Sequence, residues 1–577
     1  MDLETLRHSC AHLLAHAVKE LYPKIKLGMG PAIENGFYYD FDRKEPFTKE
    51  ELKAIDKKMR EIAKRKLPIE EVKLTKKEQN DYFKQEPYKK ELANELKTLT
   101  FYKQGDFIDL CKGPHVENTK ELKGLYKLPR AASAYWKGDS KNKQLQRIYG
   151  YAFKSKDKLK AFIKQREEAE KRDHNKLGKQ LDLFVHSSEV GKGLPLLTPK
   201  GAIIKRTLQR FIEDEEMKRG YVPTSTPVLT KTELYKISGH LDHYRESMFV
   251  FEANGEELAL RPMTCPHQFM IYKSKMRSYR DLPLRYAEVA DLFRNEQSGE
   301  LHGLIRIRQF SLADAHIICT PEQIAKEFED VVILIQDLMK ILGFKDYWYR
   351  FSKGDVTKKD KYINNPKAWK DSEASMKKIL DNMKLDYVEE EDEAAFYGPK
   401  LDVQMRNVYG KEDTLFTVQI DFALPERFDM TYEGKDGKKH RPMVIHRSSI
   451  GCIERTMALL IELYAGKFPL WLSPLQVKLL TVTDRANKFA EHVLQELRKA
   501  GIRAELDNRS ESINKKVREA TLEKVPLIVV LGDKEIEGKI LSVRTLNGEV
   551  HNRIGIKKFI KLVQENINDK LLIFEFK

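Results

Sequence analysis

The sequence is poor in cysteine and contains no long apolar run. Its five cysteines, at positions 10, 111, 265, 319 and 452, are far apart and form no CxxC pair. That pattern excludes a disulfide framework and is typical of a reducing compartment, where each thiol is free for packing, catalysis or metal binding. No stretch approaches the roughly 20 apolar residues of a membrane-spanning helix. The N-terminal MDLETLRHSCAHLLAHAV predicts an amphipathic helix rather than a signal peptide. We therefore expect a cytoplasmic protein.

Internal repeats and low-complexity tracts are also lacking. Lysine and arginine number 104 against 88 aspartates and glutamates, which gives a formal net charge of +16. A strongly basic globular chain favours a polyanionic partner, nucleic acid first and membrane surface second. A general lysine bias explains the same charge without any partner, so both interpretations stay open. The length of 577 residues predicts several domains rather than one core.

Four regions follow one another along the chain. Residues 1–155 mix predicted helices with short strands. Residues 156–180 have almost no large apolar face and predict one bridging helix. Residues 181–470 predict a large α+β region with many short strands. Residues 471–577 alternate apolar strands with amphipathic helices, which predicts a compact βαβ-type domain with a mostly parallel sheet.

The segment 293–316, FRNEQSGELHGLIRIRQFSLADAH, combines several kinds of charged and metal-binding residues. An apolar run ends in it, a glycine-containing loop follows, and Ile305–Phe310 alternates apolar with basic residues. The pattern predicts strand, loop, strand. A nucleotide site and a solvated charged hairpin both fit this pattern. The side chains that would face a polyanionic ligand are Arg294, Glu296, Arg306 and Arg308.

Three remote residues have metal-ligand chemistry: Cys265, His316 and His446. One thiolate and two imidazoles leave a position for substrate, as catalytic zinc sites do. No local spacing supports the grouping, so a buried cysteine and two core histidines is the competing interpretation. Arg455 follows Gly451 in a mostly apolar helix and needs an anionic partner. A phosphate and an internal carboxylate are equally good candidates.

The N-terminal region carries a second group of this kind. His8 and His12 stand four residues apart on one predicted helix face, and Cys111 and His115 repeat that spacing in CKGPH. The spacing is compatible with zinc. An amphipathic helix with polar-face histidines, continued by His16, is the structural alternative.

Several of these segments together resemble the class II aminoacyl-tRNA synthetases. FRNE, its loop and RIRQF resemble motif 2, GCIER and its helix resemble motif 3, and GYVPTSTPVL (220–229) resembles the dimer-forming motif 1. Cys265, His316 and His446 fall where the threonine-specific members place their zinc ligands. SGHLDHY, AFYGPKLDV and VQIDFALPERF are also similar. The match keeps the domain order of the bacterial-type threonyl-tRNA synthetases that have an N-terminal editing domain.

The resemblance implies a multidomain α+β and α/β fold. It implies an α+β editing domain in 1–155, a linker helix in 156–180, a class II antiparallel-sheet catalytic core in 181–470 and an α/β anticodon-binding domain in 471–577. The implied activity is ligation of L-threonine to tRNA(Thr) through an adenylate made with ATP, followed by hydrolysis of mischarged seryl-tRNA(Thr). One Zn²⁺ per subunit, Mg²⁺ with ATP and a homodimer are implied. The ubiquitin-like N-terminal domain of many relatives is not expected in this sequence.

The resemblance also implies residue roles. Arg294 would hold the α-phosphate and Arg455 the γ-phosphate, so charge neutralisation and positioning carry the reaction without a protein nucleophile. Phe310 would stack on adenine and Glu296 would accept from its amino group. The remaining implied residues are Arg306 and Lys400 (catalytic); Gln419 (ATP); Met263, Asp314 and Tyr397 (threonine); Cys265, His316 and His446 (metal); His8, His12, Lys89, Asp109, Cys111 and His115 (editing); and Glu535 and Arg544 (anticodon).

Zinc would explain selectivity only in part. A site that engages the threonine hydroxyl rejects valine by roughly 10⁴-fold, whereas serine loses only a methyl group worth about 1–3 kcal/mol. A second sieve is therefore expected, and the family's editing domain hydrolyses seryl-tRNA without a metal. A water activated by histidine or lysine would attack the seryl ester.

The sequence departs from the family pattern at several positions. The usual Gln-Asp-Asp-Ala-His is Leu-Ala-Asp-Ala-His at 312–316, which keeps Asp314 but puts a substrate or 3′-adenosine contact at Leu312 in doubt. The usual Asn-Cys-Pro-Gly-His is Thr-Cys-Pro-His-Gln at 264–268, which alters the surroundings of the first metal ligand. Ser510 and Cys452 replace a common asparagine and a small polar residue.

Two other classes of function fit parts of this pattern. One is a synthetase paralogue that binds RNA without charging it, and the other is a hydrolase that only deacylates tRNA. Retention of both arginines and all three metal-type ligands argues against them. Threonine-dependent exchange of pyrophosphate into ATP separates the three classes, because only the ligase would have it.

Overall fold

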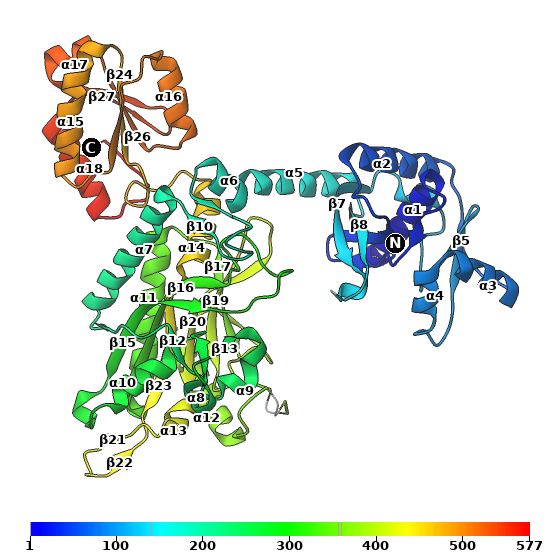
Figure 1. The fold of residues 1–577 in the computed structure, drawn as a ribbon, viewed down its shortest axis with the longest axis horizontal. Coiled ribbons are helices and arrows are strands. Elements are labelled where there is room, and N and C mark those ends of the chain that lie inside the picture. The colour runs from blue at the N-terminus through cyan, green and yellow to red at the C-terminus, as the bar shows by residue number, and fades with distance from the viewer. Residues whose placement is uncertain (1, 140, 356, 359–360, 577) are drawn as a thin grey trace. The chain divides into compact units, whose positions relative to one another are not determined.

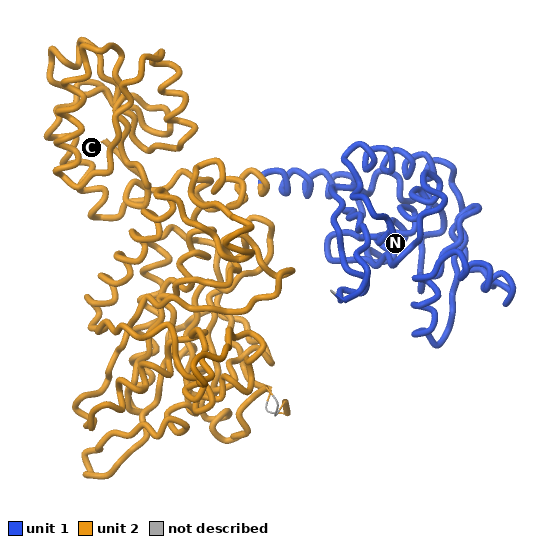
Figure 2. The backbone as a smooth tube through the Cα atoms, viewed as in Figure 1, with its two compact units in different colours: residues 1–168 blue, residues 169–577 orange. Residues whose placement is uncertain are grey.

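The computed structural model describes residues 2–139, 141–355, 357–358 and 361–576. Contacts divide the chain into two units, residues 1–168 and 169–577 (Figures 1 and 2). Each unit has its own hydrophobic core, so each is described by itself.

Unit 1 is built around a helix with almost no exposed face. In α1 (Leu3–Leu21) every residue from Ser9 to Val18 is buried, and the Asp2 carboxylate caps its first turn. The helix packs on an antiparallel sheet of order β1-β3-β8-β7, with β2 paired to β3. The elements of the unit are β1 (Lys26–Leu27), β2 (Ala32–Ile33), β3 (Gly36–Asp42), α2 (Lys49–Lys64), β4 (Ile69–Val72), α3 (Lys76–Gln85), α4 (Pro87–Ala93), β5 (Phe101–Gln104), β6 (Phe107–Leu110), β7 (Tyr126–Tyr135), β8 (Gln144–Ala152) and the start of α5 (Lys156–Arg172). Strands β4, β5 and β6 form a second antiparallel sheet.

Unit 2 contains an eight-stranded sheet of order β11-β15-β16-β23-β20-β19-β17-β18. Its six inner strands are antiparallel and only the two edge strands pair in parallel. The strands are β11 (Val222–Pro223), β15 (Leu284–Phe293), β16 (Gln309–Cys319), β17 (Tyr347–Ser352), β18 (Tyr387–Glu390), β19 (Lys400–Arg406), β20 (Glu412–Asp421) and β23 (Met443–Cys452).

Helices cover one face of this sheet, and the other face is covered in part and also holds the site. Apolar side chains of α7, α11 and α14 form one core with the inward side chains of the strands. The helices of this part are α6 (His174–Gln180), α7 (Pro199–Lys218), α8 (Glu233–Ser238), α9 (His240–Tyr244), α10 (Cys265–Lys273), α11 (Ile324–Leu342), α12 (Pro366–Asn382), α13 (Leu424–Arg427) and α14 (Ile453–Tyr464). Short strands complete it: β9 (Phe184–Val185), β10 (Leu196–Leu197), β12 (Leu229–Lys231), β13 (Phe249–Ala253), β14 (Glu256–Leu260), β21 (Tyr432–Glu433) and β22 (Lys439–His440).

The C-terminal part of unit 2 has a mixed sheet of order β25-β24-β26-β27-β28. The first three strands are parallel and the last two antiparallel, so the prediction of a mostly parallel sheet holds only for one half. The connections around β27 are shorter than the dozen or so residues a parallel crossover needs. The elements are β24 (Val477–Thr481), α15 (Asn487–Lys499), β25 (Ala504–Asp507), α16 (Ile513–Leu522), β26 (Leu527–Leu531), α17 (Asp533–Gly538), β27 (Ile540–Thr545), β28 (Val550–Gly555) and α18 (Ile556–Asn568).

Two further predictions are corrected. The single helix expected over 156–180 is two helices, α5 and α6, because the Asp173 carboxylate accepts from the N–H groups of Asn175 and Lys176 and starts a new helix. The strand expected from Ile305 begins only at Gln309. The preceding residues form a turn instead.

Candidate functional site

A cleft of about 780 Å³ opens in unit 2 on the face of the large sheet that lies opposite the core formed with α7 and α11. Its walls come from strands β16, β19, β20 and β23, the loop after β15, and the first turns of α10 and α14. The sequence predicts thirteen residues for catalysis, nucleotide, amino acid or metal in this unit, and all of them line this cleft. They are Met263, Cys265, Arg294, Glu296, Arg306, Phe310, Asp314, His316, Tyr397, Lys400, Gln419, His446 and Arg455.

The three predicted metal ligands meet at one end of the cleft. His316 of β16 lies directly opposite His446 of β23 in the antiparallel register, with ring centroids 4.6 Å apart. Cys265 starts α10, and one ligand atom of each residue lies within 4.8 Å of the others. The three side chains therefore converge in space. All three are also buried, as the interpretation as core residues predicts, so convergence is the observation that favours a metal.

Each imidazole of this group is fixed by a neighbouring oxygen. His316 Nδ1 lies 2.6 Å from Gln268 Oε1, and His446 Nε2 lies 2.8 Å from Asp421 Oδ2. Such contacts set the tautomer and leave the other ring nitrogen free to ligate. Gln268 also donates to Thr224 Oγ1 at 2.7 Å. The departure from the family pattern at position 268 thus supplies a partner for the second ligand.

The same end of the cleft favours a cation. Burial, followed by the charges of Asp314 and Asp421, raises the pKa of the Cys265 thiol well above its usual range. Burial lowers the pKa of His316 well below its usual range, so its imidazole is neutral. A neutral imidazole and a thiol that becomes a thiolate when a cation binds suit Zn²⁺.

Arginines gather at the other end of the cleft. The Arg294 guanidinium lies 5.1 Å from the centre of the Phe310 ring. Arg455 donates to the backbone oxygens of Ile305 at 3.1 Å and Thr414 at 2.9 Å. No ion pair joins Arg455 to a carboxylate among the residues that the structure describes. Of the two partners considered for Arg455, the internal carboxylate is therefore not seen.

Two other predicted cations already have carboxylate partners. Arg306 pairs with Glu296 at 2.7 Å and with Glu300 at 2.9 Å. Lys400 Nζ lies 3.1 Å from Asp402 Oδ2. The expected contact of Glu296 with adenine therefore has to share this carboxylate with Arg306.

Leu312 and Ala313, the two residues of β16 that differ from the family pattern, point to opposite faces of the sheet. Leu312 and Asp314 face the cleft together with His316, whereas Ala313 is buried in the core on the helix-covered side. Of the two replaced residues only Leu312 can affect a ligand. It packs with Cys452, the other altered position, in an apolar group beside Phe310.

Sequence reasoning missed one buried histidine of the cleft. His240 starts α9, and its Nδ1 lies 2.8 Å from Ser238 Oγ. Its ring centre lies 6.3 Å from that of Tyr397. Burial, with a smaller effect of His446, lowers its pKa to about 3. The segment SGHLDHY pointed to the family, but nothing in its spacing marked this residue.

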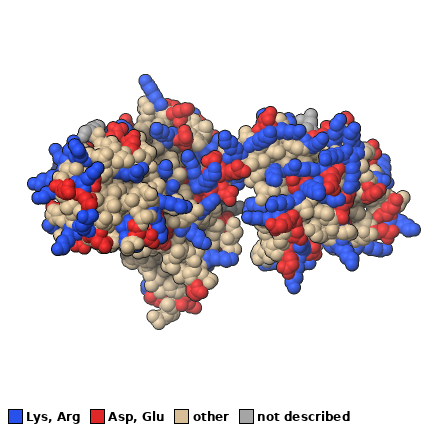
Figure 3. Space-filling view, turned by 90° about the horizontal axis from the view of Figure 1, so that it is seen from above, with Lys and Arg blue, Asp and Glu red and all other residues tan. Residues whose placement is uncertain are grey.

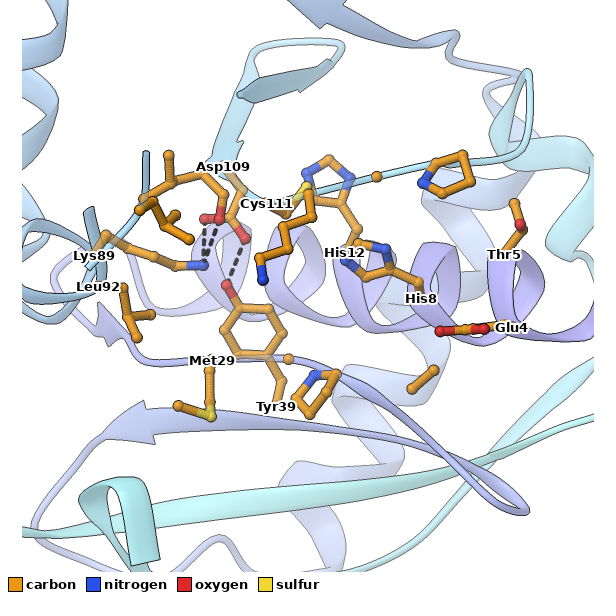
Figure 4. A pocket seen from close by; sticks show the side chains of 18 of the residues that line it. Glu4, Thr5, His8, His12, Met29, Tyr39, Lys89, Leu92, Asp109 and Cys111 are labelled. Atoms are coloured by element: carbon orange, nitrogen blue, oxygen red, sulfur yellow. Dashed lines mark hydrogen bonds and ion pairs between the residues drawn. The ribbon is translucent and has the colours of Figure 1, made fainter. Parts of the chain in front are cut away.

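Unit 1 has a pocket of about 650 Å³ of its own (Figure 4). Asp109 at its base accepts hydrogen bonds from Tyr39 at 2.5 Å and Tyr82 at 2.9 Å. Lys89 lies 2.8 Å from the same carboxylate and donates to Leu110 O at 3.1 Å. Lys89 and Asp109 are both buried. Two tyrosines that the sequence did not single out thus fix the buried ion pair.

The predicted histidine and cysteine pairs converge beside this ion pair. His8, His12, Lys89, Asp109 and Cys111 line the pocket, and His115 packs against both His8 and His12, with ring centres 4.5 and 4.8 Å away. Its Nε2 lies 3.1 Å from Cys111 Sγ and its Nδ1 3.1 Å from Ser9 Oγ. Both ring nitrogens of His115 therefore have partners. One ligand atom each of His8, Cys111 and His115 also lies within 4.8 Å of the others, so the geometry fits both the zinc interpretation and a metal-free site. The polar-face interpretation is wrong for His12 and His16, which are buried.

These histidines make unit 1 sensitive to acid. Burial lowers the pKa of His16 to about 4 and that of His115 to about 2. Below about pH 6.5 the unfolded chain binds protons that the folded unit does not, so stability falls as the pH falls. By pH 5 we expect each of the two to cost about 2 kcal/mol relative to pH 8.

Calorimetry between pH 8 and pH 5 measures this effect. The His16→Gln variant is expected to lose less stability over that range, while His186→Gln, at an exposed histidine, behaves as the wild type. An unfolding transition of unit 1 that does not move between pH 8 and pH 5 contradicts the prediction.

The predicted anticodon residues do not share a pocket. Glu535 lies on α17 and accepts from its own cap residue Gly532 at 2.9 Å, while Arg544 is half-buried on β27. Neither lines the pocket of about 390 Å³ in this part of the chain. Ser510 does line it, at the ends of β24 and β25.

The visible surface carries Lys and Arg in many places with Asp and Glu interspersed (Figure 3). The net positive charge is therefore spread rather than confined to one cluster on that face. Within the described residues no helix has the length and apolar character needed to cross a membrane.

Three family models match the chain. Residues 246–464 match the class II tRNA synthetase core domain (G, H, P, S and T). Residues 476–566 match an anticodon binding domain and residues 99–149 the second additional domain of threonyl and alanyl tRNA synthetases. Together with the antiparallel sheet and its cleft, these matches define a class II aminoacyl-tRNA synthetase.

Individual relatives narrow the class. A threonine–tRNA ligase of Clostridium botulinum (strain Alaska E43 / Type E3) is 55% identical over 98% of this chain and 89% of its own length. That of Listeria monocytogenes (serotype 4a, strain HCC23) is 48% identical over 98% and 89%. The crystal structure of the RNA binding domain of threonyl-tRNA synthetase from Cryptosporidium parvum is 33% identical, with a TM-score of 0.65 over 70% of this chain and 99% of that one. The chain belongs to the threonine–tRNA ligase family and combines aminoacylation with editing of mischarged tRNA.

Proposed function

We propose that the cleft of unit 2 joins L-threonine to ATP as threonyl-adenylate and passes the threonyl group to tRNA(Thr). The observation that carries the proposal is the convergence of a metal-type triad and an arginine group in one cleft. A threonine carboxylate oxygen attacks the α-phosphorus and pyrophosphate leaves. The 3′-terminal ribose hydroxyl of the tRNA then attacks the acyl carbon and AMP leaves.

Cys265, His316 and His446 would hold one Zn²⁺. When bound, the ion supplies open coordination positions for the amino nitrogen and hydroxyl of threonine. Asp314, Met263 and Tyr397 line the cleft beside these ligands and would surround the amino acid. Tyr397 donates to Gln419 Oε1 at 2.5 Å, which fixes both side chains before substrate arrives.

The arginines would neutralise the triphosphate, which enters with Mg²⁺. Arg294 would hold the α-phosphate and Arg455 the γ-phosphate, with Arg306 and Lys400 adding charge. The backbone contacts of Arg455 leave its charge uncompensated by a carboxylate within the described chain. Phe310 would stack on adenine, and Gln419 and Glu296 would contact the nucleotide.

The pocket of unit 1 would hydrolyse seryl-tRNA(Thr). Its histidines and Lys89 would activate a water, which attacks the ester carbonyl carbon. The bond between this carbon and the ribose oxygen then breaks, which releases serine and the tRNA with a free ribose hydroxyl. Burial raises the pKa of the Cys111 thiol to about 12, so this group is protonated at neutral pH. We assign Cys111 to binding and not to nucleophilic attack.

We further propose the division of the chain into residues 1–155 for editing, 156–180 as linker, 181–470 for aminoacylation and 471–577 for the anticodon, with Glu535 and Arg544 contacting its bases. A homodimer is proposed through the motif 1 segment. Its strand β11 is an edge strand with Val222 46% exposed, and an open apolar edge favours pairing. A cytoplasmic location is proposed from the five free cysteines.

Threonine-dependent exchange of pyrophosphate into ATP tests the activation step. Arg294→Ala is expected to lower kcat by about 10²–10³-fold, because a charge-stabilising donor at the reacting phosphate is lost. The matched control is Arg280→Ala, at an exposed arginine outside the cleft, which leaves exchange unchanged. Wild-type protein without any threonine-dependent exchange would overturn the proposal.

A further inference from the structure

A buried histidine outside the cleft contacts the loop that carries Arg306. His174, the first residue of α6, is fully buried, and its Nδ1 lies 2.7 Å from Oε1 of Glu462 on α14. The Leu304 N–H points at its Nε2 from 3.3 Å. Because Nε2 accepts, the ring proton lies on Nδ1 and is donated to the carboxylate. The neutral ring therefore joins a catalytic-domain helix to the loop.

The contacted segment is a tight turn, residues 302–306. The N–H of His302 donates to Arg306 O at 3.1 Å and the N–H of Arg306 donates to His302 O at 3.2 Å. Between them Gly303 has φ +50°, and a Cβ there would lie 2.0 Å from Nε2 of His174. Only glycine allows this approach. The His302 ring meets the His174 ring edge-on, with centres 5.2 Å apart.

The other side of the 302–306 turn touches the cleft. Ile305 O accepts from Nε of Arg455 at 3.1 Å. Arg455 and Glu462 belong to the same helix, α14. Two side chains thus hold the turn. Arg455 bonds to it from the cleft side, and His174, which is itself hydrogen-bonded to Glu462, contacts it from the opposite side.

A metal is the alternative occupant of this place. Asp173, His174 and Glu462 have ligand atoms within 4.8 Å of one another. Each already has a hydrogen-bond partner, however: Tyr409 donates to Asp173 at 2.8 Å, and the N–H of Val408 donates to the second oxygen of Glu462 at 3.3 Å. With both ring nitrogens of His174 also engaged, the group favours a hydrogen-bonded anchor.

We propose that His174 is a positioning residue for threonine activation, which fixes the 302–306 turn and thereby the placement of Arg306 and Arg455 around ATP. This inference rests on the proposed activation reaction. The linker segment that leads from α5 into α6 is then part of the nucleotide site, although His174 itself does not line the cleft.

The test compares three substitutions in the pyrophosphate exchange assay. His174→Ala removes both contacts and is expected to lower kcat/KM for ATP by about 10²-fold, since a shift of about 1 Å in a positioning group has that effect. KM for threonine stays within twofold, because the metal end of the cleft is untouched. His174→Gln places an oxygen where Nε2 accepts and recovers most of the loss. His174→Asn keeps a donor for Glu462 but no acceptor for Leu304 and stays impaired.

Controls separate positioning from folding and from the reaction itself. The His186→Ala variant, changed at an exposed histidine directly after β9, is expected to match the wild type in exchange. Each variant is also expected to hydrolyse pre-charged seryl-tRNA at the wild-type rate. The proposal is overturned if His174→Ala keeps its ATP parameters, or if Asn restores them as well as Gln does. It is also overturned if threonine and ATP parameters fall together. Absence of exchange in the wild type would instead remove the proposed function.

Discussion

Replacing Cys265 with serine is expected to remove the bound zinc and lower threonine-dependent pyrophosphate exchange by about 10³-fold or more. The thiolate is the only anionic ligand of the proposed set, and the two neutral imidazoles hold the ion poorly without it. The zinc content measured by elemental analysis should fall from one ion per chain to none. Selectivity should fall as well: we expect the wild type to prefer threonine over valine by roughly 10⁴-fold and the variant to lose most of that preference.

Cys319→Ser is the matched control for this experiment. Cys319 lies on the same strand as His316 and is equally buried, but it packs in the core on the helix-covered face. It should keep its zinc and its exchange activity, apart from a small loss of stability. A Cys265→Ser protein that keeps one zinc per chain would show that the zinc is held by other residues.

The second large effect concerns the pocket of unit 1. Lys89→Ala is expected to slow hydrolysis of seryl-tRNA(Thr) by about 10³-fold, within the range for loss of a positioned acid–base group. The change also leaves Asp109 buried without its cation, and only Tyr39 and Tyr82 still donate to it. Pyrophosphate exchange with threonine should be unaffected, because the activating residues belong to unit 2.

Lys90→Ala provides the control for Lys89, since it removes a lysine from the next position of α4 where the side chain is exposed. Lys89→Gln adds a variant that keeps a donor for Asp109 without the charge. If all three proteins hydrolyse seryl-tRNA within twofold of the wild type, Lys89 has no part in editing. If Gln restores the rate lost in Ala, the hydrogen bond matters and the charge does not.

The sequence predicts which side chains line the two pockets better than it predicts the residues that orient those side chains. Cys265, His316 and His446 were grouped through the resemblance to a family and not through their spacing. Chain separation carries no information about strand register, and it is the pairing of β16 with β23 that sets the two histidines opposite each other. Gln268 and Asp421, which orient these ligands, depend on the same packing. The sequence alone therefore does not predict them.

Other errors had signals that were present in the sequence. The Asn-Gly pair at 547–548 is typical of a hairpin turn, and it lies in the four-residue connection between the antiparallel β27 and β28. Gly303 lies in the predicted loop, but the turn around it extends to Arg306, so the strand begins at Gln309 and not at Ile305. Asp173 marked a helix cap within a charged helix. His240 had no such signal, because its place in the cleft depends on contacts between distant segments.

The ion pairs of Arg306 with Glu296 and Glu300 determine how much negative charge an anion needs in order to displace them. The Arg306 side chain is 45% exposed, so each pair contributes about 1 kcal/mol or less. A triphosphate can displace two such carboxylates at little cost, whereas a singly charged anion gains too little to compete with both. If Arg306 has the role proposed for it, nucleotide binding at this loop is an exchange of two carboxylates for phosphate oxygens around one guanidinium.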